Sequence, residues 1–350
     1  MSLFELPFTD VSKAPKQDVL FKSAPEDFQV FEIMGFEPSG DGEHLWLDVL
    51  KKGKNTQDLA RDLAKHFNVD KNAVAYSGLK DKNAITRQCF TVHLPGKGKL
   101  IGMPVFRDVD IVNKTRHNKK LKTGVHQGNQ FIITLRDVSD VEELIGRLAT
   151  IKEQGFPNYF GHQRFGFDRS NLTNAMEWLI TGKRPRQRFL EGMYLSALRS
   201  YIFNMSLAER VAQGNWNQLC AGDFAQFDWS KSGFVVENTD DDRCCHGEIH
   251  PAIALFDGNH QLPDSLAELA DQSWFDKFRK KRFSPENRSL RIIPKGLSWT
   301  LPEEGVLQVS FSLPTGSYAT SLLKEVCELQ EPERKNTQYS PERHSPEKIG

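Results

Sequence analysis

The sequence predicts a protein of mixed helices and strands in which one domain is inserted into another. Strand-like and helix-like patterns alternate over the first 150 residues. Residues 156–290 show a different pattern of apolar residues, and one strand and one helix are again predicted after residue 291. A chain of 350 residues is long enough for two domains. We therefore expect residues 1–155 and 291–330 to form one domain and residues 156–290 to form the inserted one.

The elements of the first domain follow from the spacing of its apolar residues. Three strands are predicted from alternation and from β-branched and aromatic content, at residues 45–49, 88–94 and 130–135. Apolar residues at fourfold spacing predict a helix through residues 59–67. A second amphipathic helix is predicted between a cap at Asp140 and a stop near Gly155.

The inserted domain and the end of the chain show other patterns. Helical stripes predict two helices, at residues 172–179 and 190–205, and the sequence then breaks up into acidic, basic and glycine-rich stretches. Beyond them, alternation predicts a strand at residues 307–313, and helical spacing predicts a helix at residues 319–326. The polar tail, residues 331–350, has three prolines and no apolar periodicity, so we expect it to be disordered.

Charge and composition limit the class of protein. The 46 basic residues balance the 46 acidic ones, yet three runs carry basic side chains without a carboxylate, at residues 114–122, 183–188 and 277–282. Such runs are either solvated faces or a surface for a polyanion, and the sequence leaves both interpretations open. Because we find no membrane-spanning stretch, no secretion signal and no disulfide framework among five cysteines, we expect a cytoplasmic protein.

The segment from Tyr76 to Gln88 contains the candidate for chemistry. Asp81 follows a glycine turn and stands between Lys80 and Lys82. A carboxylate between two cations is expected to stay ionised at neutral pH, which suits a nucleophile or a base. A surface turn with locally paired charges is the alternative, and spacing alone does not decide between the two.

No other motif offers a competing mechanism. The sequence has no phosphate-binding loop, no serine-hydrolase elbow and no zinc-protease motif. Cys244, Cys245, His246 and His250 form a cluster, but adjacent cysteines are awkward zinc ligands and no second cysteine pair lies at zinc-ribbon spacing. We interpret this cluster as structural and expect no metal site.

Five longer blocks of sequence are more specific than these short motifs. They are KSAPEDFQVFE at residues 22–32, SGLKDKNAITRQ at 77–88, KLKTGVHQGNQF at 120–131, PNYFGHQRFG at 157–166 and LPTGSYATSLL at 313–323. In this order, the blocks resemble the TruD family of tRNA pseudouridine synthases. The resemblance implies an α+β fold, with a pseudouridine-synthase-type catalytic domain built on a mixed, largely antiparallel sheet and an inserted α/β TRUD domain.

The same resemblance implies a reaction. TruD-like enzymes convert a uridine of tRNA, at position 13 in the bacterial members, to pseudouridine, and they use neither cofactor nor metal. Their nucleophilic aspartate corresponds to Asp81. Whether C1′ of the ribose or C6 of the uracil is attacked first stays open.

The substrate pocket implied by the resemblance has five residues besides Asp81: Lys22, Phe28, Asn129, Phe131 and Tyr318. Phe28 would line the uracil site, Asn129 would bond the base or its ribose, and Phe131 would stack on the ring. Lys22 would pair with Asp81, and Tyr318 stands where many relatives carry Phe. Without the resemblance, Phe28, Asn129 and Phe131 would all be interpreted as structural: Phe28 and Phe131 as core residues of strands, and Asn129 as a turn residue.

The expected macromolecular partner is tRNA, bound by a protein that acts as a monomer. The residues expected to contact RNA are Lys114, Arg116, Lys119, Lys120, Lys122 and Arg164, and the other two basic runs would form the opposite wall of a cleft. Whether Arg164 contacts RNA or only supports packing stays open. A tRNA-folding chaperone with secondary catalysis and a uracil-releasing glycosylase are the alternative functions.

Overall fold

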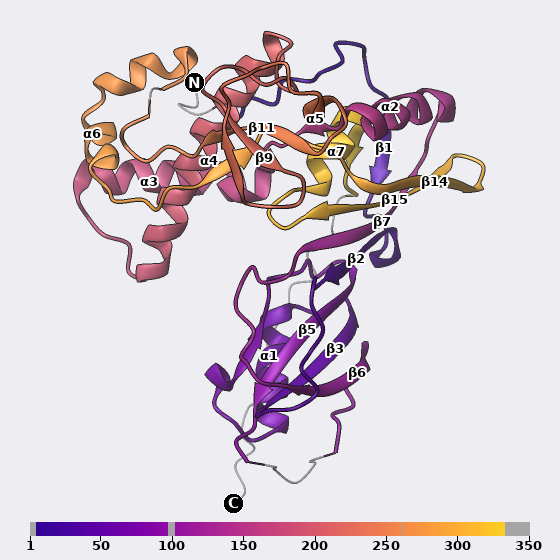
Figure 1. The fold of residues 1–350 in the computed structure, drawn as a ribbon. Helices are drawn as coiled ribbons and strands as arrows, with labels where there is room; N and C mark the ends of the chain where they lie inside the picture. The colour runs from indigo at the N-terminus through magenta and orange to yellow at the C-terminus, as the bar shows by residue number, and fades with distance from the viewer. Residues whose placement is uncertain (1–4, 97–101, 261, 333–350) are drawn as a thin grey trace, which may run out of the picture.

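The protein is described by a computed structural model over residues 5–96, 102–260 and 262–332 (Figure 1). All but the first two residues of the tail expected to be disordered, 331–350, lie outside these ranges. A large sheet runs through the lower and middle parts of Figure 1, and the elements of residues 156–290 lie beside its upper end. We call residues 156–290 the inserted unit.

The main sheet is mixed and largely antiparallel, as predicted. Within the described residues its central strands run in the order β14 (Lys295–Glu303), β15 (Val306–Pro314), β7 (Gly128–Arg136), β2 (Phe28–Ile33), β5 (Ile85–His93), β3 (His44–Lys52) and β6 (Val109–His117). Three short strands complete it: β1 (Asp18–Phe21), β4 (Val74–Tyr76) and β16 (Glu328–Gln330). Only the β2–β5 and β1–β16 pairings in this described sheet are parallel.

Three helices cover the main sheet. Helix α1 (Thr56–His66) packs Leu59 and Leu63 against the core of β3, β4 and β5, and each such buried leucine stabilises the fold by about 1.5–3 kcal/mol. Helices α2 (Val141–Gln154) and α7 (Ala319–Val326) pack against the core of β7 and β15. Asn55 caps α1, and Asp140 caps α2 by accepting from the backbone N–H of Glu143, as the sequence predicts for Asp140.

The inserted unit has a small sheet and its own core. Its helices are α3 (Ser170–Thr181), α4 (Arg188–Ala212), α5 (Asp242–Cys245) and α6 (Ser273–Arg279). Its described strands, all antiparallel, run in the order β10 (Gly233–Val235), β9 (Phe224–Phe227), β11 (Ile249–Ala254) and β12 (Asn287–Ser289). Phe203, Phe275 and Phe278 are among the rings buried in this core.

The chain enters and leaves the inserted unit at one place. Strand β8 (Phe156–Pro157) follows α2 directly and pairs with β13 (Arg291–Ile292), which directly precedes β14. This pairing brings together the two positions expected as the boundaries of the inserted unit, which stay a prediction. Leu6 and Phe8 nevertheless pack against the core of the inserted unit, and the backbone N–H of Val11 donates to Glu325 on α7, so residues 6–11 bridge the two parts.

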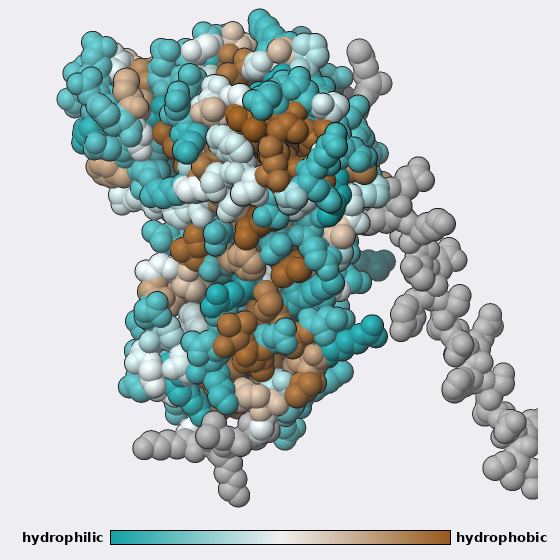
Figure 2. Space-filling model, turned by 90° about the vertical axis from the view of Figure 1, so that its right-hand side faces the viewer, coloured by the Kyte–Doolittle hydropathy of each residue, from teal (hydrophilic) through white to brown (hydrophobic). Residues whose placement is uncertain are grey.

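Figure 2 shows one face of the molecule, on which apolar residues form several areas separated by hydrophilic ones. None of the helices in the described residues is both long and apolar enough to cross a membrane.

Candidate active site

The loop between β4 and β5 carries Asp81, and neighbouring side chains fix its course. We call residues 77–84 the active-site loop. The backbone N–H of Lys80 donates to Thr56 Oγ1 over 3.1 Å, and Gln88 Nε2 donates to the carbonyl of Gly78 over 3.3 Å. Thr56 and Gln88 are also hydrogen-bonded to each other and are fully buried, so the loop rests on a rigid base.

Lys22 and Asp81 form an ion pair. Lys22 Nζ lies 2.6 Å from Asp81 Oδ2, and the two side chains are 4% and 27% exposed, so the carboxylate has some access to solvent while the ammonium has almost none. The same ammonium lies 4.1 Å from the centre of the Phe28 ring, which adds a cation–π contact. The ion pair and the cation–π contact together hold the Lys22 ammonium beside the Asp81 carboxylate.

A second lysine, Lys51, lies under the active-site loop. Its Nζ donates to the carbonyl of Lys54 over 2.7 Å and lies 3.5 Å from the carbonyl of Asp81. Burial lowers the pKa of Lys51 to about 8, although the charge of Asp81 acts in the opposite direction. The sequence analysis missed this residue, but there was a signal, because Lys51 continues the inward-facing alternation of Leu47 and Val49 on β3.

Asn129 is connected to the active-site loop by Lys80. Lys80 Nζ donates to Asn129 Oδ1 over 2.6 Å and forms an ion pair with Glu32 at 3.0 Å. Glu32 lies directly opposite Asn129 in the β2–β7 pairing. Sequence reasoning selected Asn129 but missed Lys80 and Glu32, since nothing in the local pattern shows that β2 and β7 are neighbours.

The predicted aromatic residues lie behind this polar cluster. The Phe28 and Phe131 rings are 6.2 Å apart, each residue is 7% exposed, and Phe131 stacks on Phe311 at 5.5 Å. The structure therefore places both rings in the core of the main sheet. Phe28 also contacts the ammonium of Lys22, so its ring reaches the candidate site from that core.

Tyr318 lies at the N-terminus of α7, against the inserted unit. Its ring centre is 6.3 Å from that of Phe160, and a β-carbon added to Gly161 would lie only 3.0 Å from Tyr318 Cδ1. Tyr318 follows the end of β15, whose Leu313 pairs with Asn129, so the same turn leads from the candidate site to the inserted unit.

The residues predicted to contact RNA fall in two places. Lys114 and Arg116 lie on β6, the edge strand at the far end of the sheet from β14, and Lys119, Lys120 and Lys122 lie in the segment that leads back to β7. Part of this segment reaches the active-site loop, because the N–H of Gly124 donates to the carbonyl of Ser77. Arg164 lies elsewhere: it donates to the hydroxyls of Ser196 and Ser200 on α4.

Trp229 of the inserted unit contacts the first residue of β7. A β-carbon added to Gly128 would lie 2.6 Å from Trp229 Cζ3, so only glycine fits beside this ring. Trp229 has a φ of 52°, a left-handed conformation that is costly for a bulky residue. Asp228, which binds His250 and Lys295, holds the preceding position. No local sequence signal pointed to Trp229.

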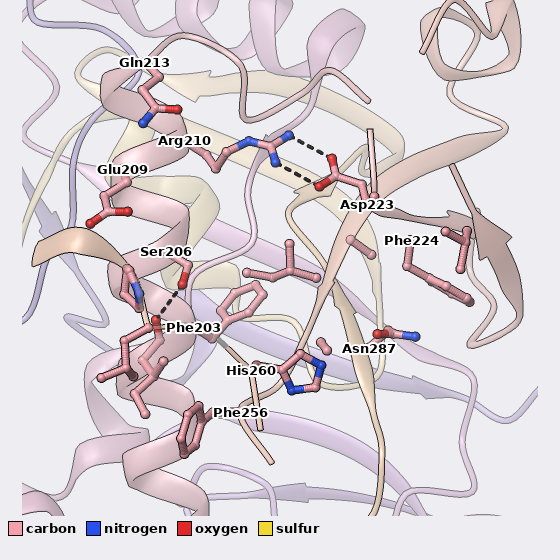
Figure 3. A pocket seen from close by; sticks show the side chains of 18 residues that line it. Phe203, Ser206, Glu209, Arg210, Gln213, Asp223, Phe224, Phe256, His260 and Asn287 are labelled. Carbon is pink, nitrogen blue, oxygen red and sulfur yellow. Dashed lines mark hydrogen bonds and ion pairs between the residues drawn. The ribbon is translucent and has the colours of Figure 1, made fainter. Parts of the chain in front are cut away.

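The inserted unit also contains a separate cavity of about 560 Å³ (Figure 3). Figure 3 shows Arg210 of α4 bound by both its terminal nitrogens to the carboxylate of Asp223, with Phe203 and Phe256 along the wall. Its lining residues all lie between residues 202 and 287, so this cavity is not the candidate active site.

The cysteine–histidine cluster does not form a metal site in the described part of the chain. No group of three or more His, Cys, Asp or Glu side chains suited to a metal ion occurs there. Arg291 instead donates to the carbonyl of Cys244 over 2.7 Å and to His250 Nδ1 over 3.1 Å. These contacts support the structural interpretation of the cluster.

Comparisons with known proteins identify the class of fold first. A crystal structure titled as a putative tRNA pseudouridine synthase D (TruD) from Methanosarcina mazei superposes with a TM-score of 0.66 at 19% identity, covering 92% of this chain and 96% of the other. The main sheet and the inserted unit therefore form a pseudouridine-synthase type of fold.

Sequence comparisons identify the family. A family model described as tRNA pseudouridine synthase D (TruD) matches residues 10–187 and 184–326. A protein of Ectopseudomonas mendocina (strain ymp) named tRNA pseudouridine synthase D is 41% identical to this chain, over 89% of this chain and 91% of the relative. A protein of Legionella pneumophila (strain Corby) with the same name is 38% identical, over 90% of this chain and 96% of the relative. The chain belongs to the TruD family of tRNA pseudouridine synthases, as the five sequence blocks predicted.

Proposed function

We propose that this protein isomerises a uridine of tRNA to pseudouridine, that the target is the uridine at position 13, and that Asp81 is the nucleophile. Membership of the TruD family supports the reaction and the RNA substrate. The observation that carries the assignment of Asp81 is its ion pair with Lys22, formed next to the Phe28 ring by a carboxylate that is still 27% exposed. A nucleophile must be reachable, and the exposure of this carboxylate, together with its pairing to a lysine, supports that role.

The reaction can be completed by the chain's own groups. The N1–C1′ bond breaks, the uracil turns while it stays bound, and a C5–C1′ bond forms. The proton lost from C5 is balanced by a proton gained at N1, so the reaction needs no oxidant or reductant, and we propose that it uses no cofactor. Asp81 forms a temporary bond at C1′ or C6 and leaves again, while Lys22 stabilises the carboxylate whenever it is free.

The remaining predicted residues have distinct proposed roles. Phe28 gives the uracil an apolar surface next to the nucleophile, and Phe131 supports that surface from behind. Asn129 supplies a directional hydrogen bond to the nucleotide. Tyr318 closes the site on the side of the inserted unit, where Gly161 leaves room for its ring.

Replacing Asp81 with asparagine tests the nucleophile. Total tRNA lacking pseudouridine at position 13 is incubated with wild type and with Asp81→Asn, the modified positions are mapped, and tRNA affinity is measured in parallel. We expect the variant to form no pseudouridine and to bind tRNA almost as well as wild type. Asp41→Asn, at an exposed position of the same domain, is the control and should be fully active.

Each other outcome of this experiment would contradict a different part of the proposal. Pseudouridine formation by Asp81→Asn would contradict the nucleophile assignment. Release of free uracil by wild type would identify a glycosylase. Activity of wild type only at other positions of the tRNA would exclude position 13 as the target but keep the reaction class.

We also propose that tRNA phosphates bind a basic surface of the inserted unit. The runs 183–188 and 277–282 are distant in sequence, but α3 and α6 lie side by side at the left of Figure 1. Lys277 Nζ donates to the carbonyl of Ile180 over 2.9 Å, and Lys281 Nζ lies 4.7 Å from the centre of the Trp178 ring. These contacts support one continuous cationic surface, which would act together with Lys114, Arg116, Lys119, Lys120, Lys122 and Arg164.

The salt dependence of KM tests this surface. Lys183→Gln combined with Lys280→Gln removes two exposed cations, so the KM for tRNA should rise, its dependence on salt should become weaker by about one counterion for each lost contact, and kcat should not change. Lys13→Gln, also at an exposed position, is the matched control. An unchanged salt dependence in the double variant would show that RNA binds elsewhere.

We further propose that the protein acts as a monomer in the cytoplasm. All five cysteines are free, which supports a reducing compartment. Light scattering at assay concentrations tests the monomer.

A further inference from the structure

The hydrogen bond between Lys80 and Asn129 fixes which end of the Asn129 amide is available. A lysine ammonium has hydrogen-bond donors and no acceptor. The Asn129 atom that lies 2.6 Å from Lys80 Nζ must therefore be the carbonyl oxygen, Oδ1. The amino group, Nδ2, is the end that remains, and within the described residues no hydrogen bond from it is recorded.

Lys80 is itself held in place by a buried carboxylate. Glu32 has a side chain that is 1% exposed and lies 3.0 Å from Lys80 Nζ. Glu32 in turn accepts hydrogen bonds from the hydroxyl of Ser77 over 2.5 Å and from the backbone N–H of Cys89 over 2.9 Å. Because both of its oxygens accept hydrogen bonds, the Glu32 carboxylate is fixed in one orientation, and it holds the Lys80 ammonium in one position.

This arrangement also links two parts of the candidate site. Lys80 is the neighbour of Asp81, and its backbone N–H is bound to Thr56, so its main chain belongs to the rigid base of the active-site loop. Its side chain is bound to Asn129 on β7. The spacing between the nucleophile and the Asn129 amide is therefore set by a single residue that is fixed at both ends.

We propose that Lys80 and Glu32 are positioning residues that orient the Asn129 amide so that its amino group donates to an oxygen of the target nucleotide. The site then offers a donor at this point and no acceptor, so it binds a carbonyl oxygen of uracil or a ribose oxygen and does not bind the N3–H group. This inference rests on the proposed function, because it assigns Asn129 to the nucleotide bound by that same site.

A double-mutant cycle tests whether Lys80 acts through Asn129. We expect Lys80→Met and Asn129→Ala each to lower kcat/KM about 10- to 100-fold, which corresponds to about 1.4–2.7 kcal/mol. The double variant should be no worse than the poorer single variant, since the orientation of Asn129 no longer matters once its side chain is gone. Lys13→Met, which removes an exposed lysine outside the active-site loop, is the control and should keep wild-type activity.

Asn129→Asp tests the donor directly and keeps a partner for Lys80. A carboxylate at residue 129 can still pair with Lys80, so we expect this variant to fold, but it can only accept hydrogen bonds. Its kcat/KM should fall as far as that of Asn129→Ala. If Asn129→Asp keeps wild-type activity, the amide acts as an acceptor and the proposed orientation is wrong.

The outcomes separate this inference from the proposed function. Failure of wild type to form pseudouridine would contradict the proposed function itself. If wild type is active and the effects of Lys80→Met and Asn129→Ala multiply, Lys80 acts independently of Asn129 and the positioning role is excluded. Urea denaturation of each variant distinguishes a loss of positioning from a loss of folded protein, and Lys80→Arg, which retains donors, should recover part of the activity lost in Lys80→Met.

Discussion

Glu325 provides a test of how burial acts on a charge in this fold. It lies on α7 with 8% of its surface exposed, and its Oε2 accepts from the backbone N–H of Val11 over 3.1 Å. Burial raises the pKa of Glu325 from 4.5 to about 7, although the Val11 hydrogen bond and the charge of Lys16 act in the opposite direction. The side chain is therefore protonated in the folded protein at pH values where it is ionised in the unfolded chain.

The sign and size of the effect follow from linkage. Between pH 4.5 and 7 the folded protein binds a proton at Glu325 that the unfolded chain has released, so this residue's contribution to stability is fully present below pH 4.5 and is lost as the pH rises through about 7. At about 1.36 kcal/mol for each pKa unit, the whole loss is about 3 kcal/mol.

Replacing Glu325 with glutamine removes this proton without removing the acceptor for Val11. We expect urea denaturation to show that Glu325→Gln gains up to about 3 kcal/mol of stability relative to wild type when the pH changes from 4.5 to 8. The contributions of the other titrating groups to the free energy of unfolding are the same in both proteins, so they cancel when the two are compared at each pH. Glu328→Gln, at an exposed position three residues further on, should show no such change. Equal differences between wild type and Glu325→Gln at both pH values would refute the reasoning.

Three further predictions concern the candidate site and its contact with the inserted unit. Lys22→Met removes a charge-assisted hydrogen bond worth about 1.5–3 kcal/mol, so steady-state kinetics should show kcat/KM falling about 10- to 100-fold. Gly128→Ala forces a β-carbon to within 2.6 Å of Trp229, so urea denaturation should show a loss of about 1–3 kcal/mol. Because burial lowers the pKa of Lys51 to about 8, the stability of wild type relative to Lys51→Met should rise between about pH 8 and 10.5, as the folded protein releases this proton first. A constant difference across that range would contradict the Lys51 prediction.

Elements with a strong local pattern could be predicted from the sequence. Residues 45–49 alternate because one side of β3 packs on α1, and the structure has β3 at His44–Lys52. The cap at Asp140 was predictable because a short acceptor side chain just before a helix can accept a hydrogen bond from a free N–H of its first turn. Strand β1 was missed, because it is four residues long and its partner β16 lies over 300 residues away in the chain, so no local pattern marks it.

The local sequence indicated Asp81 as a candidate, and the resemblance named the residues expected around it. Lys22 and Asn129 were named in this way. In the structure Lys22 pairs with Asp81, and Asn129 is bound by Lys80, the neighbour of Asp81. Lys80 and Glu32 look like surface charges in the sequence, and only the folded structure shows that they form a buried ion pair.

The strand register explains why these residues must act together. Phe28 and Glu32 lie at even spacing on β2, and Asn129 and Phe131 lie at even spacing on the neighbouring strand β7. Since alternate residues of a strand face the same side of a sheet, all four share one face, on which the active-site loop lies. A slip of one residue between these strands would place the Glu32 carboxylate and the Asn129 amide on opposite faces, so Lys80 could no longer contact both. The joint contact of Lys80 with Glu32 and Asn129 therefore depends on the same register that places the two rings.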